Sequence, residues 1–276
     1  ASGTVSMSGQ HNTGATYALS LSGSTSSTAG TGVTVESLND NTGTIALLSS
    51  GGIDGGSGTV LMRAANYAFG GADRTITTTG VLTIEPDADE NSFASSFDNQ
   101  YLNPVSVTGL TLGKSSNASA ITLSRAISLS GPVSIYGGSI DVNANITANS
   151  GNILLDADTG STLNQSSTGI LLDDAITIET VTSGNLTLIG RSGDTGSGFD
   201  GIDASSANTT TLRSAGNLTL QGYSYAASGS GRGVDLNNDV IAASGTVSMT
   251  GQHNTGATYA LSLSGSTSIT AGTGVT

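Results

Sequence analysis

The residues best suited to chemistry lie in one acidic segment, EPDADENSFASSFDNQYLNP, at positions 85–104. Asp87, Asp89 and Asn91 have the one-three-five spacing of a calcium-binding loop, and Asp98 falls at its twelfth position. The sixth position, where such a loop needs Gly, is Ser, and the twelfth ligand is normally Glu. The segment therefore meets part of the calcium pattern, and calcium binding stays an open alternative.

Three aromatic residues, Phe93, Phe97 and Tyr101, share this segment, which has no basic residue and no strand-like alternation. We expect a long loop whose aromatic side chains fold back over the edge of the fold. A contact patch for a neighbouring fibre or ligand is the second interpretation.

Polysaccharide-cutting enzymes need clustered carboxylates with a basic residue nearby. The chain has one adjacent Asp pair, Asp173-Asp174, which we interpret as a turn at the end of a strand. His11 and His253 each lie between Gln and Asn in a predicted turn, with no Ser, Cys or acidic partner at an informative spacing, so no triad is predicted. The sequence predicts no catalytic, cofactor-binding or metal-ligating residue.

Two glycine-rich stretches, residues 190–203 and 228–240, are the remaining candidates for a ligand loop. Neither ends in the Gly-Lys-Ser/Thr of a phosphate-binding loop, and neither has the tandem nonapeptide period of calcium-binding β-helix repeats. We predict that both are turns and that the protein binds no cofactor.

Composition limits the partners that such a surface can have. The 276 residues include 20 acidic and 7 basic side chains, which gives a net charge of −13 that would repel nucleic acid and anionic lipid head groups. There is no Cys, and no apolar run approaches the roughly 20 residues of a membrane-spanning helix. We predict no nucleic-acid partner and no membrane insertion.

The elements that position these residues are short strands. Apolar–x–apolar triplets recur between clusters of Gly, Asn, Asp and Ser, and this alternation is typical of strands with the outer residues facing a core. The triplets include Leu110–Leu112, Ile121–Leu123, Val133–Ile135, Ile153–Leu155, Leu186–Leu188 and Leu218–Leu220. No sustained helical stripe accompanies them, which disfavours helices. The regular arrangement of the apolar residues disfavours disorder.

Short strands at this spacing favour a right-handed parallel β-helix (β-solenoid) of about 22 residues per coil, with longer loops on some coils. A β-sandwich is the alternative, although it would require longer strands and hairpin turns such as Asn-Gly, which the chain lacks. We expect Leu186, Leu188, Leu218 and Leu220 to point into a narrow core.

The chain begins and ends with nearly the same segment. Residues 1–34 and 243–276 differ only by Ser8→Thr250 and Ser27→Ile269, at an offset of 242 residues. We interpret residues 1–242 as one solenoid repeat of about 11 coils and residues 243–276 as the start of the next. The Ser8→Thr250 change is expected to face outward, and Ser27→Ile269 is expected at a turn or coil edge.

Stretches such as SGNILLDADTGSTL, SGNLTLIG and SAGNLTLQG resemble the repeats of filamentous-haemagglutinin-like bacterial adhesins, and residues 109–220 are the most telling part of the resemblance. These large secreted exoproteins commonly belong to two-partner secretion systems. The resemblance implies a right-handed parallel β-helix in an extracellular or cell-surface fibre that acts in attachment, without catalytic residues.

The expected function is therefore a structural repeat, a rigid spacer in a giant adhesin. Its expected partners are further repeats that associate end to end, and surface glycans or the surface of a neighbouring cell. A carbohydrate-active β-helix is the alternative, for which an Asp-lined groove with Arg or Lys would be the discriminating feature. Ice binding is disfavoured because the outward residue and the coil length both vary.

Overall fold

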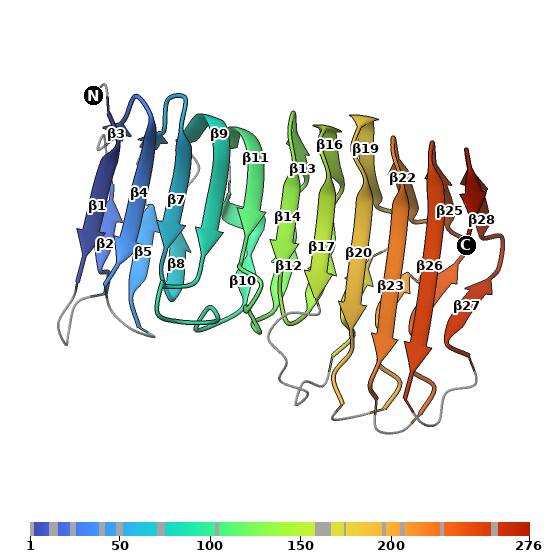
Figure 1. Ribbon diagram of the computed structural model, residues 1–276. Coiled ribbons are helices and arrows are strands. Elements are labelled where there is room, and N and C mark those ends of the chain that lie inside the picture. Colours follow the sequence, from blue (N-terminus) through green and yellow to red (C-terminus); the bar gives the residue numbers. More distant parts are fainter. Residues whose placement is uncertain are drawn as a thin grey trace.

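The computed structural model describes residues 3–10, 16–22, 26–38, 42–47, 52–70, 75–102, 105–157, 167–173, 175–194, 197–204, 208–226, 229–254 and 259–276. In these ranges the chain forms strands and one 3-10 turn, η1 (Asn99–Tyr101), without an α-helix. No helix among these residues has the length and apolar character needed to cross a membrane. The strands follow one another along one long axis, from the blue N-terminal end to the red C-terminal end (Figure 1).

The largest sheet runs the whole length of the molecule. Its strands, in spatial order, are β1 (Val5–Gly9), β4 (Gly32–Ser37), β7 (Thr59–Arg63), β9 (Thr75–Glu85), β11 (Val105–Leu112), β14 (Val133–Tyr136), β17 (Ile153–Ala157), β20 (Leu186–Arg191), β23 (Leu218–Ser224), β26 (Thr246–His253) and β29 (Gly274–Val275). Two short strands, β3 (Ser26–Thr28) and β6 (Gly52–Asp54), join this sheet through the first half of β9.

Three further sheets complete the other faces. One contains β2 (Leu19–Leu21), β5 (Thr44–Leu47) and β8 (Asn66–Phe69). The second contains β10 (Phe97–Asp98), β12 (Ile121–Leu123), β15 (Ile140–Val142), β18 (Ile170–Leu172), β21 (Ile202–Ala204), β24 (Val234–Asn237) and β27 (Leu261–Ser264). The third contains β13 (Ile127–Leu129), β16 (Ile146–Ser150), β19 (Thr177–Ser183), β22 (Thr211–Ser214), β25 (Val240–Ala243) and β28 (Ser268–Ala271).

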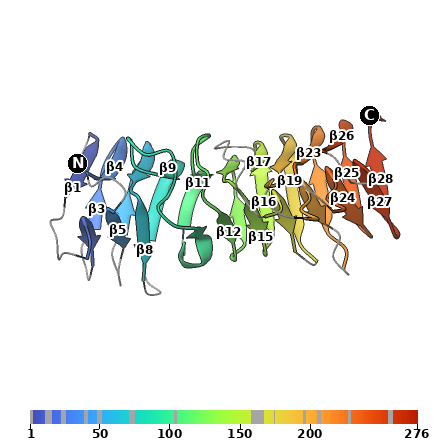
Figure 2. The same ribbon diagram turned by 90° about the horizontal axis from the view of Figure 1, so that it is seen from below.

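Consecutive strands visit the faces in turn, so that β14, β15 and β16 are followed by β17, β18 and β19 directly above them. Each of these pairings is parallel, and the layers of successive coils are also visible from below (Figure 2). The fold is an all-β parallel solenoid, which confirms the predicted class over the sandwich alternative. Its right-handed winding stays a prediction, supported by the strong preference of parallel crossovers for that hand.

The predicted coil length is wrong. Neighbouring partners in the long sheet are 20 residues apart at Val133 and Ile153 but 33 apart at Ile153 and Leu186. From β1 to β26 the long sheet advances nine strands, so one 242-residue period holds nine coils in place of about 11. The estimate failed because the closely spaced triplets between Leu110 and Ile153 belong to the coils with the shortest corners. At about 4.8 Å per strand, one period is about 43 Å long.

The core is a set of stacked apolar ladders. Leu186 lies in register with Leu218, and Leu188 with Leu220, and all four side chains are fully buried, as predicted. The second face adds an Ile ladder in which Ile140 pairs with Ile121 on one side and Ile170 on the other. Like side chains therefore pack on like side chains from coil to coil, and this burial is the main favourable term in stability.

Asparagines at the corners link the coils in the same way. The Oδ1 atom of Asn152 accepts from the backbone N–H of Asn185 at 2.9 Å, and Asn185 accepts from Asn217 at 2.8 Å. Asn217 in turn accepts from Thr246 at 2.9 Å. Each Asn satisfies a corner N–H of the next coil, which explains the recurring Gly-Asn before the triplets.

A break interrupts two of the three faces in the middle of the molecule. β8 ends one sheet and β10 begins the next, and residues 86–96 pass between them without a strand. The side chains of Phe93 and Phe97 are buried there against Tyr67 and Phe69, with ring centroids 5.4 to 6.2 Å apart. The prediction that aromatics of this segment fold back over the solenoid is confirmed for Phe93 and Phe97, whereas the side chain of Tyr101 lies outside the described part.

The two substitutions between the terminal copies differ in outcome. Ser8 and Thr250 are both exposed, as predicted. Ile269 lies inside β28, pairs with Ile241 and packs against the core, so the expected turn or coil edge is wrong. The Ser and Thr residues around Ile269 hide the alternation that would predict a strand. Its inward position follows only from its register with Ile241 in the preceding coil.

Replacing Leu218 by Asp is expected to lower the free energy of unfolding by about 3 kcal/mol or more, because an unpaired carboxylate would replace a buried apolar side chain. Chemical denaturation followed by circular dichroism measures this loss. Thr219→Asp, on the outward side of the same strand, is the matched control and should change stability by less than about 1 kcal/mol. Equal losses in the two variants would contradict the inward assignment.

Candidate functional site

The described carboxylates converge at one place, on the second face near the C-terminal end. Asp203 is the second residue of β21 and Asp235 the second residue of β24, and the two are in register on adjacent strands. Strand alternation directs Ile202 and Val234 into the core, where both are fully buried, and leaves the aspartates on the other side. Two like charges are thereby placed directly opposite each other, which is unfavourable without compensation.

Asp200 and Arg232 complete this acidic cluster, which we define as Asp200, Asp203 and Asp235. One carboxylate oxygen from each of the three residues lies within 4.8 Å of the others. The backbone N–H of Arg232 donates to Asp200 Oδ1, and its guanidinium forms an ion pair with Asp235 Oδ2. Asp200 and Asp235 are buried. The arginine therefore compensates part of the charge through both its backbone and its side chain.

Burial gives two carboxyl groups in this region unusual proton affinity. Removal from water is the main cause that raises the pKa of Asp200 to about 7; the charges of Asp203 and Asp235 act in the same direction, and the hydrogen bond from the Arg232 N–H acts against it. Burial likewise raises the pKa of Asp239 to about 6, against hydrogen bonds from the N–H groups of Thr210 and Asn237 at 3.1 and 2.9 Å. Near neutral pH the cluster can therefore hold a proton on Asp200 beside the Arg232–Asp235 ion pair.

Three roles are chemically compatible with the acidic cluster. Its carboxylate oxygens are ligands that hard cations such as Ca²⁺ prefer. An acid held protonated beside an ionised carboxylate is also the pair that glycoside hydrolysis uses. The burial of Asp200 and Asp235 and their hydrogen bonds to Arg232 favour a third role, in which the group joins two coils.

The sequence prediction missed this cluster, because its members lie in the two glycine-rich stretches that we interpreted as turns. The cluster could have been found from the number of residues between strand partners on adjacent coils. Asp203 and Asp235 are 32 residues apart, as are Leu186 and Leu218, which are also partners on adjacent coils. Applying that local coil length to residues 190–203 would have superposed the aspartates.

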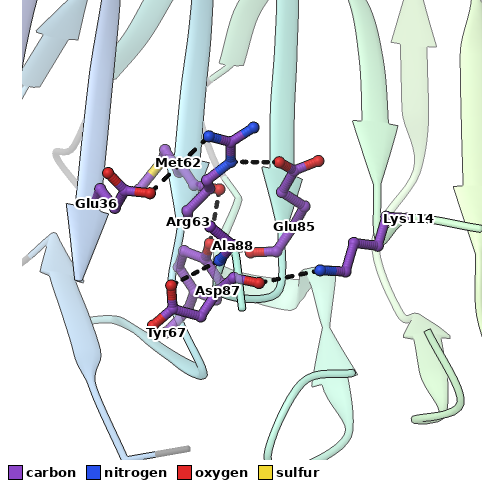
Figure 3. A network of polar contacts seen from close by, with 8 residues as sticks. All are labelled: Glu36, Met62, Arg63, Tyr67, Glu85, Asp87, Ala88 and Lys114. Carbon is purple, nitrogen blue, oxygen red and sulfur yellow. Dashed lines mark hydrogen bonds and ion pairs between the residues drawn. The ribbon is translucent and has the colours of Figure 1, made fainter. Parts of the chain in front are cut away.

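A second polar network lies on the long sheet near the break (Figure 3). Arg63 stands between Glu36 and Glu85 on adjacent strands, with Nε 2.5 Å from Glu85 Oε1 and a terminal guanidinium nitrogen 3.9 Å from Glu36 Oε1. The hydrogen bond to Glu85 is the main cause of a raised Arg63 pKa, which burial opposes. This alternation of charge along the ladder neutralises two carboxylates that stacking would otherwise bring together.

The same network ties the acidic segment to the solenoid. The Tyr67 hydroxyl lies 2.8 Å from the carbonyl oxygen of Met62 and 2.7 Å from that of Glu85, and burial raises its pKa well above the usual value. Lys114 Nζ donates to the carbonyl oxygen of Asp87 at 3.0 Å, and Asp87 Oδ1 accepts from the N–H of Ala88 at 2.6 Å (Figure 3). These contacts hold the beginning of the segment in place.

The residues of the partial calcium pattern do not form a cluster of carboxylates. Among the described residues the one group of three close carboxylates is the acidic cluster, so Asp87, Asp89 and Asp98 do not come together. Asp98 caps η1 by accepting from Gln100 N–H at 2.8 Å, and its other oxygen accepts from Ser124 at 3.1 Å. The backbone carbonyl oxygen of Asn91 accepts from the Ser116 hydroxyl. The spacing thus reflects local turn and capping contacts.

The remaining candidates lie apart from both groups. Asp173 directly follows β18 and is exposed, as expected for a turn, whereas Asp174 lies outside the described residues. His253 is exposed at the end of β26, with Nδ1 beside the carbonyl oxygen of Asn254, and His11 is also outside the described part. A pocket at the break in the third face is lined by Leu102, Val107, Leu110, Arg125, Ile127 and Leu129, among others.

Comparison of the chain with protein-family models, with curated proteins and with solved structures gives no match. The function is therefore argued from the residues and the fold.

Stability should rise on acidification. Asp200 and Asp239 bind protons at higher pH in the folded chain than in the unfolded one, so their contribution is complete below about pH 4 and is lost as the pH rises through about 6 to 7. We expect the melting temperature in calorimetry to be about 5 °C higher at pH 5 than at pH 8.

Asp200→Asn keeps an acceptor for the Arg232 N–H and should reduce this pH dependence. Asp89→Asn, at an exposed position of the acidic segment, is the control and should retain it. A melting temperature that is the same at pH 5 and pH 8, or a slope unchanged in Asp200→Asn, would contradict the assignment.

Proposed function

We propose that this chain is a rod-forming repeat of a large bacterial adhesin, exported to the cell surface or beyond it, where it acts as a rigid spacer in attachment. The proposal combines the parallel solenoid with the near-identity of residues 1–34 and 243–276. Further repeats of the same rod are its partners, and surface glycans or a neighbouring cell are the targets of the whole fibre.

One observation carries the rod proposal: the sequence period is a whole number of coils. Val5 and Val247 are separated by one period of 242 residues, and their strands β1 and β26 are nine steps apart in the same sheet. A period with a fractional coil would place the second copy on a different face and interrupt the stacking. A whole number supports continuation of one solenoid from repeat to repeat without a linker.

The region where the second copy begins supports the same reading. β26 pairs with β23, β27 with β24 and β28 with β25, each parallel and in register, as between interior coils. Leu218, in the first repeat, pairs with Val247, in the second, and both are fully buried. Nearest-neighbour stacking of this kind makes a repeat array stiff along its axis.

The length of chains with tandem copies tests the proposal. Chains with one, two and three copies of residues 1–242, each followed by residues 243–276, should lengthen by about 43 Å per added copy in X-ray scattering. A matched chain with a flexible Gly/Ser linker between copies is the control, since its maximum dimension should vary and its copies should reorient. Increments well below 43 Å, or scattering that resembles the linker control, would contradict a continuous rod.

A carbohydrate-active β-helix is the second candidate, and the acidic cluster with Arg232 is the observation that favours it. On the rod proposal the purified chain should release no reducing ends from acidic or neutral polysaccharides. Turnover that is lost in Asp235→Asn and kept in Asp89→Asn would favour the enzyme and overturn the spacer role.

A further inference from the structure

A pocket of about 230 Å³ opens at the break in the third face, between β11 and β13, which are neighbours along the axis (Figure 1). The first half of β11 pairs with β9, where Val105–Val107 lie in register with Ile76–Thr78. β13 is the first strand of its sheet and pairs with β16. Within the described part of the chain no ladder joins this half of β11 to β13, so the two coils separate here. We call the space between them the wedge.

Backbone groups border the wedge. Its closed end is a hydrogen bond from Gly131 N–H to the carbonyl oxygen of Thr108 at 2.7 Å. Farther along β13, Ile127 N–H donates to the carbonyl oxygen of Asn145 at 2.9 Å, so the backbone of Ile127 faces the following coil. The backbone groups of successive residues in a strand point to opposite sides, and those of Ser128 therefore face the wedge. They supply a donor and an acceptor that no described strand uses.

The wedge opens the core to solvent at this coil. Ile127 is 7% exposed, whereas Ile146, its partner in the next coil, is 0% exposed. Leu110 is 5% exposed, whereas its partners Leu82 and Val133, on either side, are 0% exposed. Because all these coils are stacked on both sides within the chain, the exposure results from the missing ladder.

The charge at the wedge is opposite to that of the whole molecule. The chain has 20 acidic and 7 basic side chains, yet no Asp or Glu is among the described residues that line the wedge. Arg125 lines it, is exposed, and forms no ion pair with another described residue. The backbone of Arg125 is fixed by Asn99, whose Oδ1 accepts from its N–H at 2.9 Å and whose Nδ2 donates to its carbonyl oxygen at 2.8 Å. An apolar space beside an unpaired cation favours an amphipathic anion.

The size of the wedge limits this ligand. Its volume exceeds the about 150 Å³ of an apolar cavity that holds benzene and is below the roughly 300 Å³ at which pockets for drug-sized ligands begin. A whole strand between β11 and β13 would hold them about 9.6 Å apart, whereas Cα atoms of the two strands come within 8 Å of each other. The wedge therefore fits a ligand of the thickness of one alkyl chain better than it fits a peptide strand.

We propose that the wedge binds a small amphipathic anion, specifically a medium-chain carboxylate. Its alkyl chain lies between Val107 and Ile127, where it covers the exposed part of the core. Its carboxylate lies beside Arg125 and accepts from the backbone N–H of Ser128. Hydrogen bonds to an ionised group are stronger than neutral ones, so the charged end fixes the orientation of the ligand.

Binding would join the two coils where their ladder is missing. The ligand contacts β11 on one side and β13 on the other, and it needs the folded arrangement of both. It should therefore stabilise the folded chain in proportion to its concentration. This inference does not depend on the rod proposal, because both coils lie within one chain.

Titration of the full chain with octanoate, in isothermal calorimetry below the micelle concentration, tests the proposal. We expect saturable binding at one site per chain and a rise in melting temperature with octanoate concentration. Butyrate should bind more than tenfold more weakly, because it buries four fewer methylene groups. Octanol and octylammonium, which keep the chain length but not the negative charge, should each bind about tenfold more weakly or worse.

Arg125→Gln should weaken octanoate binding about tenfold and leave the weak binding of octanol unchanged, because it removes the charge and keeps the apolar walls. Arg213→Gln is the matched control: Arg213 is an exposed arginine on β22 of the same face, outside the wedge, and its loss should change neither. Leu129→Phe fills part of the wedge and should weaken octanoate and octanol alike. Circular dichroism checks that each variant keeps its strands.

Three results would each overturn the proposal. The first is the absence of saturable octanoate binding to the unmodified chain. The second is equal affinity for octanoate, octanol and octylammonium, which would show that charge has no part in recognition. The third is an equal loss of binding in Arg125→Gln and Arg213→Gln, which would place the effect in the overall charge of the chain and outside the wedge.

Discussion

Every part of this structure depends on the parallel, in-register pairing of each coil with the one below it. That pairing satisfies the backbone, and it also forces the side chain at one position to lie on the side chain at the same position of the next coil. Apolar positions gain from this constraint, as in the stacked Ile140 and Ile170. Corner asparagines gain as well, because the amide oxygen of Asn152 or Asn185 reaches the N–H of the following coil.

The same constraint creates the chemistry on the outer surface. Stacking places Asp203 directly on Asp235, and the repulsion is reduced by the ion pair of Arg232 with Asp235 and by the pKa of buried Asp200, which is raised to about 7. On the long sheet the strand that carries Arg63 lies between the strands that carry Glu36 and Glu85, so each carboxylate is next to the arginine and not next to the other carboxylate. Both groups are therefore understood as compensation for stacking, which accounts for their burial and for their hydrogen bonding without a substrate.

Sequence patterns predicted what repeats locally and failed where the coil length changes. The apolar triplets identified the strands and the inward side of Leu186 and Leu218, because a period of two residues needs no tertiary information. The number of coils, the strand around Ile269 and the acidic cluster all depend on which residues lie one coil apart. Since corner loops make that distance vary from 19 residues, between Ile127 and Ile146, to 34, between Ile178 and Leu212, it follows from packing and cannot be taken from one average period.

The break beside β8 and β10 divides the solenoid into two cooperative blocks. The long sheet carries a backbone ladder across it; elsewhere in the described residues the blocks are joined by the hydrogen bonds from Ala94 N–H to the Ala65 carbonyl oxygen and from Ser95 to Asn66, and by the packed rings of Tyr67, Phe69, Phe93 and Phe97. The seam is therefore joined by fewer backbone hydrogen bonds than the coils on either side of it. A filament of such units would therefore carry one compliant joint in every period, so that mechanical load opens the aromatic seam before it unravels either block.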